Sequence, residues 1–258
     1  MDLTLSCFGL TTAINLHRSQ AGSHLVRIPN TARVLDVLTE AFWSSSSEEV
    51  ERLASTFNAP KFWAGEEGYE FSREHLPGLL QGENPRFLDV GCSVGQLVTF
   101  LQETRFWSQL EYIGVDADAE AVRVAQQRHA DADFQVCDAQ TTLSEALGRF
   151  DIVFTKGTIC STYRPFDALD AILDCSSKSA LLVHTACTTS DCGEDGFVTT
   201  LYASKSNAYV FTIMNIERLQ DRIRERGFDV AVRTIRKHPK NVLNLGAYRL
   251  YDFVLHRT

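Results

Sequence analysis

The stretch FLDVGCSVGQLVTF, residues 87–100, restricts the fold more than any other part of the chain. It begins as a short apolar run, is interrupted by Gly91 and Gly95, and continues with apolar residues at helical spacing. This pattern predicts a strand, a glycine turn and the start of a helix. A glycine turn lets the backbone approach a ligand because no Cβ intervenes, and the free N–H groups of a helix N-terminus favour anions and nucleotides. The stretch therefore predicts a ligand-binding turn.

Strands and helices alternate regularly from residue 86 onwards. The predicted strands cover 86–90, 111–115, 132–136, 150–154 and 180–185. The predicted helices cover 95–106, 119–128, 141–147, 166–175 and 216–226. This alternation predicts a doubly wound α/β fold, in which a mostly parallel sheet carries helices on both faces. Two later extended runs, 228–235 and 248–255, predict an antiparallel pair that closes the sheet.

The residues before the sheet predict a helical extension. Apolar residues recur at helical spacing in 34–42, 50–57 and 72–80. A polar cluster at 82–85 then marks a boundary. We therefore expect a helical N-terminal cap at 1–84 and a ligand-binding domain at 85–258. We expect the cap to lie over the carboxyl ends of the strands and to exclude water from the site.

Acidic residues stand directly after successive predicted strands. Asp116 follows the second strand, 25 residues beyond Gly91 (116 − 91 = 25), and Asp138 follows the third. The carboxyl ends of parallel strands meet at one edge of a doubly wound sheet, where such folds bind ligands. A carboxylate there can accept hydrogen bonds from ribose hydroxyls or from an exocyclic adenine amine. Each aspartate taken alone fits a helix N-cap equally well.

The glycine turn differs from the dinucleotide-binding pattern G-x-G-x-x-G, because Ser93 and Gln96 stand at its third and sixth positions. An acid, Asp89, precedes Gly91 by two residues. The stretch instead resembles the first motif of class I S-adenosylmethionine-dependent methyltransferases, an acid and one residue followed by G-x-G-x-G, with Ser93 in place of the middle glycine. The sequence GFDV at 227–230, after a predicted helix, is also similar to that family.

The resemblance implies a fold, an activity and a cofactor. The implied fold is a doubly wound, mostly parallel seven-stranded sheet whose last strand inserts antiparallel, and the implied activity is methyl transfer from S-adenosyl-L-methionine. The residues implied to face the methionyl part are Asp89, Gly91 and Gly95. Those implied to hold the ribose and the adenine are Asp116, Asp138 and Ala139. Neighbours at the same strand ends complete the predicted cofactor site: Cys92, Ser93, Ala117 and Thr155.

Methyl transfer from a sulfonium is an in-line displacement, so the protein must mainly orient the acceptor and exclude water. A general base helps when the acceptor is a hydroxyl or an ammonium group. His184, at the end of the fifth predicted strand, is the candidate base, and a hydrogen-bonded core histidine is the alternative reading. The candidate substrate contacts are Trp63, Tyr69 and Tyr163, with core packing as their alternative role.

We expect no metal site. Cys187 and Cys192, with His184 and Asp191, are the residues from which a zinc site could be imagined, but no C-x₂-C pair supports one.

Charge and motif content narrow the class of substrate. The net charge of −8 disfavours a polyanionic partner such as nucleic acid. In methyltransferases that modify amines of nucleic acids, a D/N-P-P-Y/F/W signature holds the target amine, and here residues 155–158, TKGT, follow the fourth strand instead. We therefore expect a small-molecule substrate and no nucleic-acid partner.

The chain also carries signals about its compartment. No apolar run approaches the roughly 20 residues of a membrane helix, and the N-terminus MDLTLSCFGL lacks the basic flank of a secretory signal. Seven cysteines, an odd number without regular spacing, are typical of reduced cytosolic thiols. We therefore expect a cytoplasmic enzyme that does not enter membranes.

Three other functions fit the same motifs. The protein could methylate a macromolecule, it could transfer or cyclise the aminocarboxypropyl group of the same cofactor, or it could bind the cofactor without turnover. The acceptor atom and the oligomeric state are not indicated by the sequence.

Overall fold

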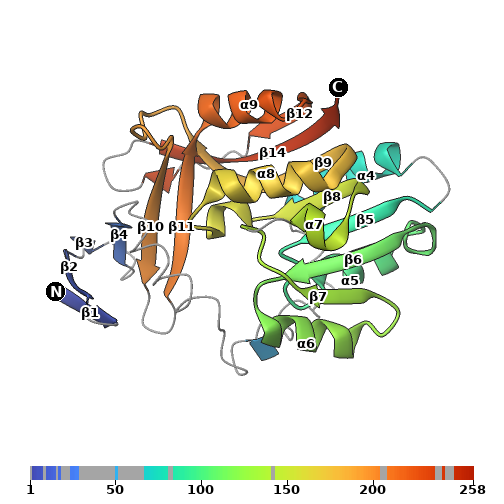
Figure 1. Ribbon diagram of the computed structural model, residues 1–258, viewed down its shortest axis with the longest axis horizontal. Helices are drawn as coiled ribbons and strands as arrows, with labels where there is room; N and C mark the ends of the chain where they lie inside the picture. Colours follow the sequence, from blue (N-terminus) through green and yellow to red (C-terminus); the bar gives the residue numbers. More distant parts are fainter. Residues whose placement is uncertain are drawn as a thin grey trace.

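The computed structural model describes residues 2–7, 10–15, 17–18, 24–28, 50–51, 67–80, 84–140, 143–203, 208–235, 240–241 and 247–258 of the chain (Figure 1). The alternating part comprises β5 (Arg86–Val90), α5 (Gln96–Gln102), β6 (Glu111–Asp116), α6 (Ala119–Arg128), β7 (Asp133–Val136), α7 (Leu143–Leu147), β8 (Phe150–Lys156), α8 (Pro165–Cys175) and β9 (Ser176–Thr188). It is completed by α9 (Ile216–Glu225), β12 (Phe228–Ile235) and β14 (Ala247–Arg257). The predicted alternation of strands and helices is confirmed, with ends that differ by a few residues.

Seven of these strands follow the spatial order β7-β6-β5-β8-β9-β14-β12. β7 to β9 pair in parallel, and β14 is antiparallel to both of its neighbours, β9 and β12. The chain moves outward from β5 to β7 and then returns to β8, so the strand order reverses between β5 and β8. This arrangement confirms the predicted doubly wound sheet with an inserted antiparallel strand, and its reversal point is where such sheets bind ligands.

The sheet extends further than predicted, because β9 continues past its pairing with β8. Beyond Val183, the last partner of β8, β9 pairs in parallel with β11 (Ala208–Asn215) at Cys187 and Thr188. β10 (Phe197–Ala203) pairs antiparallel with β11, and β4 (His24–Ile28) pairs antiparallel with β10, on the side toward which β6 points in Figure 1. The described residues thus place twelve strands in one sheet. We did not predict β10 and β11, although their β-branched and aromatic runs are typical of strands.

The N-terminal extension contains strands as well as a helix. β1 (Asp2–Cys7) and β2 (Leu10–Asn15) form a separate hairpin, and β3 (His17–Arg18) pairs with β4. The prediction of a purely helical extension is therefore wrong for this part, where pairing with other strands decided the structure. The helix α4 (Glu67–Leu79) confirms the third predicted helix, and the other two fall almost wholly outside the described residues.

Two helical layers bury the two faces of the sheet, as Figure 1 shows for α8 in front of it and α5 behind it. Side chains of α7, α8 and α9 pack with Leu88, Val153 and Leu182 on one face. Side chains of α4, α5 and α6 pack with Phe87 and Phe154 on the other. Helix α4 therefore shares a core with the sheet and with the helix that follows the glycine turn. No helix within the described ranges is long and apolar enough to cross a membrane.

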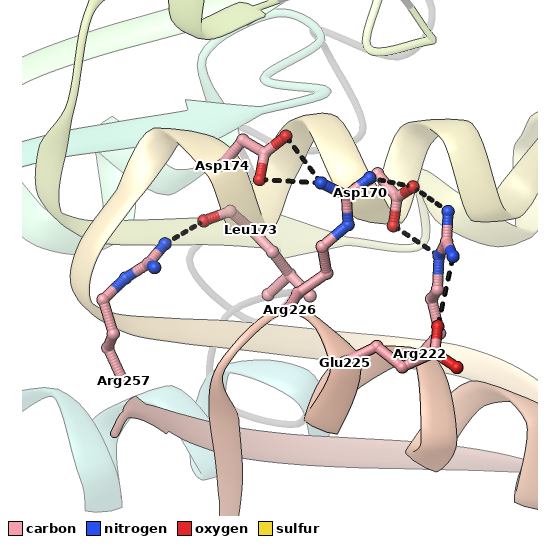
Figure 2. Close-up of polar contacts among 7 residues, drawn as sticks. All are labelled: Asp170, Leu173, Asp174, Arg222, Glu225, Arg226 and Arg257. Atoms are coloured by element: carbon pink, nitrogen blue, oxygen red, sulfur yellow. Dashed lines mark hydrogen bonds and ion pairs between the residues drawn. The ribbon is translucent and has the colours of Figure 1, made fainter.

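An ion-pair network joins α8 to α9 (Figure 2). The carboxylate of Asp170 accepts hydrogen bonds from the guanidinium groups of both Arg222 and Arg226, and Arg226 also reaches Asp174 at 3.0 Å. Arg257, at the end of β14, donates to the carbonyl oxygen of Leu173 at 2.9 Å. The network ties the C-terminal part of the chain to the middle of α8.

Replacing Asp170 by Asn is expected to lower the free energy of unfolding by about 1–3 kcal/mol, because a largely buried carboxylate that serves two guanidinium groups would be lost. Its side chain is 11% exposed. Asp221→Asn is the control, because Asp221 and Arg224 form an ion pair within α9 whose side chains are 61% and 60% exposed. Denaturant unfolding should place the control within about 0.5 kcal/mol of the wild type. Equal losses in both variants would contradict this account.

Candidate active site

The glycine turn after β5 is held against the end of β6. The backbone N–H groups of Gly91 and Cys92 both donate to the carbonyl oxygen of Val115, at 2.8 and 3.0 Å. Gly91, Ser93 and Gly95 all have positive φ angles, of 79°, 49° and 80°. A serine in the left-handed region is uncommon but accessible. The turn therefore keeps its tight form with Ser93 at the middle position of the motif.

Thr158, in the loop after β8, closes one side of the turn. Its hydroxyl donates to the carbonyl oxygen of Val90 at 2.9 Å. A Cβ at Gly91 would lie 1.9 Å from the Thr158 Oγ1. Gly91 is thus required both by its φ angle and by the close approach of Thr158. We did not predict a role for Thr158, because its partner Val90 lies 68 residues away in the sequence.

His129 closes the other side of the turn. A Cβ at Gly95 would lie 2.6 Å from the His129 Cδ2, and the ring also contacts Phe134. Burial, with help from the neighbouring Arg128, lowers the pKa of His129 to about 4. The imidazole is therefore neutral at physiological pH and acts as a packing group beneath the turn.

Asp116 connects the end of β6 to the turn. Its carboxylate accepts hydrogen bonds from the N–H groups of Ser93 and Asp118, at 2.8 and 2.9 Å. Asp118 is the N-cap of α6, since its side chain accepts from the N–H groups of Glu120 and Ala121. The alternative reading of Asp116 as the helix cap is therefore wrong. Burial raises the pKa of Asp116, and the hydrogen bonds from Asp118 and Ser93 partly offset that effect.

Asp138 and Ala139 lie at the end of β7, the neighbour of β6. The Asp138 carboxylate accepts from the N–H of Gln140 at 2.9 Å. The side-chain oxygen of Gln140 accepts from the N–H groups of Tyr163 and Arg164, at 3.1 and 3.0 Å. Gln140 therefore connects the predicted adenine-side residues to the segment before α8. We did not predict this residue, because the contact spans 23 residues.

Asp89 is buried on the face of β5 that α4 and α5 cover, where its side chain is 2% exposed. It accepts a hydrogen bond from the hydroxyl of Tyr112 at 2.8 Å. Burial, with a smaller contribution from Asp116, raises the pKa of Asp89 to about 7, although the hydrogen bond from Tyr112 and the charge of Lys156 act in the opposite direction. The carboxyl group can therefore gain or lose a proton near neutral pH.

The predicted substrate contacts have different surroundings. Tyr69 is buried on α4, with its ring 5.0 Å from that of Phe100 and 5.0 Å from the Lys156 Nζ. Tyr163 is also buried, and burial raises the pKa of its hydroxyl well above the ordinary value. Trp63 lies outside the described residues. The burial of both tyrosines shows that they pack within the fold, and their contact with substrate stays a prediction.

Thr155 lies in β8 beside Val90 of β5. Its hydroxyl is buried and has no hydrogen-bond partner, the single side-chain oxygen or nitrogen of this kind among the described residues. An unmade hydrogen bond of this type costs roughly 1–3 kcal/mol. A ligand that approaches the end of β8 could supply the missing partner.

His184 lies in β9 just beyond the end of β8. Its backbone φ is 59°, and its N–H donates to the carboxylate of Asp252 at 2.8 Å. Its carbonyl oxygen accepts from the Sγ of Cys160, in the loop that also contains Thr158. His184 is partly exposed, whereas Asp252 is 1% exposed. Asp252 was not predicted.

The structure thus brings together the turn residues Gly91, Ser93 and Gly95 with Asp116, and connects His184 to the same edge through the loop after β8. Cys92 is buried, and burial raises the pKa of its thiol well above the ordinary value, so it is not a nucleophile. No group of three or more metal-ligating side chains gathers within the described part of the chain.

Residues 81–205 match the family model described as a methyltransferase domain. No curated protein matches the chain.

Three solved structures illustrate the likeness in fold. A methyltransferase from Methanosarcina mazei, described as S-adenosylmethionine-dependent, aligns with a TM-score of 0.53 at 14% identity, over 71% of this chain and 97% of that one. An S-adenosylmethionine-dependent methyltransferase from Clostridium acetobutylicum aligns with a TM-score of 0.54 at 10% identity, over 80% of this chain and 98% of that one. The N-terminal domain of EvdMO1, solved in the presence of SAH and D-fucose, aligns with a TM-score of 0.55 at 15% identity, over 84% and 98%. The described strands therefore have the arrangement found in that class of enzyme.

Proposed function

We propose that this chain, whose residues 81–205 match a methyltransferase domain and whose sheet shares the fold of S-adenosylmethionine-dependent methyltransferases, transfers a methyl group from S-adenosyl-L-methionine to a small-molecule metabolite. The observation that carries the proposal is the position of Asp116, whose carboxylate joins the turn after β5 to the end of β6.

Asp116 suits the ribose. An ionised carboxylate has about four lone-pair sites, and the two bonds from Ser93 and Asp118 each use one oxygen atom. Each oxygen therefore keeps one site for a ribose hydroxyl. Ala117 follows directly in the same loop. The N–H bond from Ser93 fixes the carboxylate relative to the turn, so the two hydroxyls would meet a preorganised acceptor.

Asp89 and Thr155 suit the methionyl part. Asp89 lies beneath the turn, where an ionised carboxylate can attract the methionyl ammonium directly or through a water. On the neighbouring strand, Thr155 lies beside Val90 on the opposite face of the sheet from Asp89, and its unsatisfied hydroxyl provides a buried donor and acceptor at the same edge. Gly91 and Gly95 keep the turn in its tight form, because a Cβ at either position would meet Thr158 or His129. On the next strands, Asp138 and Ala139 would meet the amine and a ring nitrogen of the adenine.

When bound, the cofactor supplies an activated methyl group on a sulfonium. The residues of the chain would hold the acceptor in line, exclude water and accept a proton where the acceptor carries one. His184 is our proposed base, and Trp63, Tyr69 and Tyr163 our proposed substrate contacts. We also propose that residues 1–84 form the cap and 85–258 the cofactor domain.

The net charge of −8 and the TKGT sequence at 155–158 support a small acceptor over a nucleic acid. We further propose a cytoplasmic location, which is supported by the odd number of cysteines, seven, and by their irregular spacing.

Asp116→Ala is expected to weaken binding of S-adenosylmethionine by about 1.5–3 kcal/mol, roughly 10- to 150-fold, because hydrogen bonds to a charged group are lost. Isothermal titration calorimetry measures this change. Asp118→Ala is the matched control, since this neighbouring aspartate caps α6 and accepts from Glu120 and Ala121. The control should lose about 1 kcal/mol of folding stability and keep its affinity. Equal affinities in both variants, or tight binding of NADH by the wild type, would contradict the cofactor assignment.

The nucleoside product left from the cofactor identifies which reaction the protein catalyses. Incubation of the full chain with S-adenosylmethionine and a metabolite extract should release S-adenosylhomocysteine, detected by mass spectrometry. Methylthioadenosine in its place would show aminocarboxypropyl chemistry. Labelled methyl groups on RNA or protein would show a macromolecular substrate, and binding without any product would show a non-catalytic protein.

A further inference from the structure

His184 lies where β9 changes neighbours. Pairing with β8 ends at Val183, and pairing with β11 begins at Cys187. On the other side, β14 pairs with β9 throughout, but the register shifts between Tyr251 and Phe253. Two residues of β9 therefore oppose one residue of β14, which is a β-bulge. Bulges of this kind commonly lie beside active sites, where they redirect a side chain.

Asp252 is the residue of β14 that lies opposite the bulge, and its carboxylate accepts a hydrogen bond from the bulged backbone. The side chain is 1% exposed and accepts from the N–H of His184 at 2.8 Å. This bond holds His184 at φ 59°, one of three positive φ angles among the described non-glycine residues. The left-handed conformation costs a histidine roughly 1 kcal/mol. Glycine would suit the backbone better, so the backbone itself gives no reason for an imidazole at this position.

The bulge faces the same edge as the cofactor turn. The N–H of Gly157 donates to the carbonyl oxygen of Val183 at 2.8 Å. The hydroxyl of Thr158 donates to the carbonyl oxygen of Val90 at 2.9 Å. Two consecutive residues of one loop thus connect Val183, where β9 leaves β8, to the end of β5. His184 directly follows Val183, so it stands one residue from this connection.

We propose that Asp252 is a positioning residue for His184: by accepting the N–H at the bulge, its carboxylate presents the imidazole to the sulfonium side of the cofactor. The inference deepens the proposed methyl transfer and rests on it. Asp252 itself does not contact the reacting atoms, because it acts through the backbone of His184. The imidazole so placed would accept the proton of a hydroxyl or ammonium acceptor.

The test compares two ligands that differ in one methyl group and one charge, S-adenosylmethionine and S-adenosylhomocysteine. Imidazole resonances of the full-length protein are recorded by NMR at one fixed pH with each ligand, and His184 is assigned by its loss in His184→Gly. We expect the His184 resonances to differ between the two complexes, because a nearby unit charge perturbs them. His256, which contacts Ser179 near the opposite end of β14, is the internal control and should be unchanged.

Variants at position 252 separate positioning from mere stability. Asp252→Ala should abolish the difference at His184, whereas Asp252→Asn, whose side-chain oxygen can still accept the N–H, should restore it. If Asp252→Ala does not fold, Asp252→Leu, of similar size but without an acceptor, takes its place. An unchanged difference in the variant without an acceptor, or no difference in the wild type while both ligands bind, would overturn the proposal. Failure of both ligands to bind in calorimetry would instead overturn the proposed function.

Discussion

Gly91→Ala is expected to destabilise the folded protein by about 2–5 kcal/mol, the sum of left-handed strain and overpacking. The new Cβ would meet the Thr158 Oγ1 at 1.9 Å and its Cβ and Cγ2 at 2.9 Å. To make room, Thr158 would have to give up its hydrogen bond to Val90. Denaturant unfolding measures the loss, and calorimetry should show a parallel loss of S-adenosylhomocysteine binding.

Gly148→Ala is the matched control for this substitution. Its φ of 78° is almost that of Gly91, and a Cβ there meets nothing within 4 Å. The control should lose only the left-handed strain of roughly 1–2 kcal/mol. Gly91→Ala combined with Thr158→Ala should recover part of the additional loss, because Oγ1 and Cγ2 are removed. If Gly91→Ala costs no more than Gly148→Ala, the close approach of Thr158 does not matter.

Asp89→Asn is expected to stabilise the ligand-free protein above pH 7, by up to about 4 kcal/mol. The pKa of Asp89 is about 7 in the folded protein, against 3.8 for an ordinary aspartate in the unfolded chain. Below pH 4 both states hold the proton, and between pH 4 and 7 only the folded state does. The stability that this carboxyl contributes is therefore present at low pH and lost as the pH rises through 7. Asn carries no charge and still accepts from Tyr112, so it avoids that loss.

The gain should shrink as the pH falls from 7 to 4, which thermal or denaturant unfolding across that range would show. Asp116 and Lys156, the charged groups that shift the pKa of Asp89, are present in both the wild type and the variant. Asp151→Asn is the control, with a stability change expected in the opposite direction. Lys178 lowers the pKa of Asp151, so loss of the Asp151 carboxylate should destabilise the protein at neutral pH. A pH-independent effect at Asp89 would contradict the assignment.

The same substitution should weaken binding of S-adenosylmethionine by roughly 10- to 100-fold, because the ionised partner of the methionyl ammonium is lost. In the wild type, the affinity should fall as the pH drops below 7 and Asp89 takes up its proton. Calorimetry at pH 6 and pH 8 tests both statements. A variant that is more stable and binds equally well would show that Asp89 does not contact the ligand.

Local patterns in the sequence determined the central sheet. Apolar periodicity, glycines and strand-end acids are properties of neighbouring residues, so they predicted β5 to β9, the helices between them and the position of Asp116. The antiparallel ending followed from two extended runs without a helix between them. Resemblance to a family added the cofactor, which no local pattern could name.

The tertiary structure alone decided which residues complete the site. Local sequence left open whether Asp116 caps a helix or faces a ligand, and the bond from Ser93 to Asp116, together with the capping of α6 by Asp118, decided against the cap. The extension of β9 by β11 depended on pairing between distant strands. The bond from His184 to Asp252 spans 68 residues. Contacts of this kind depend on strand order and register, which only the folded chain sets.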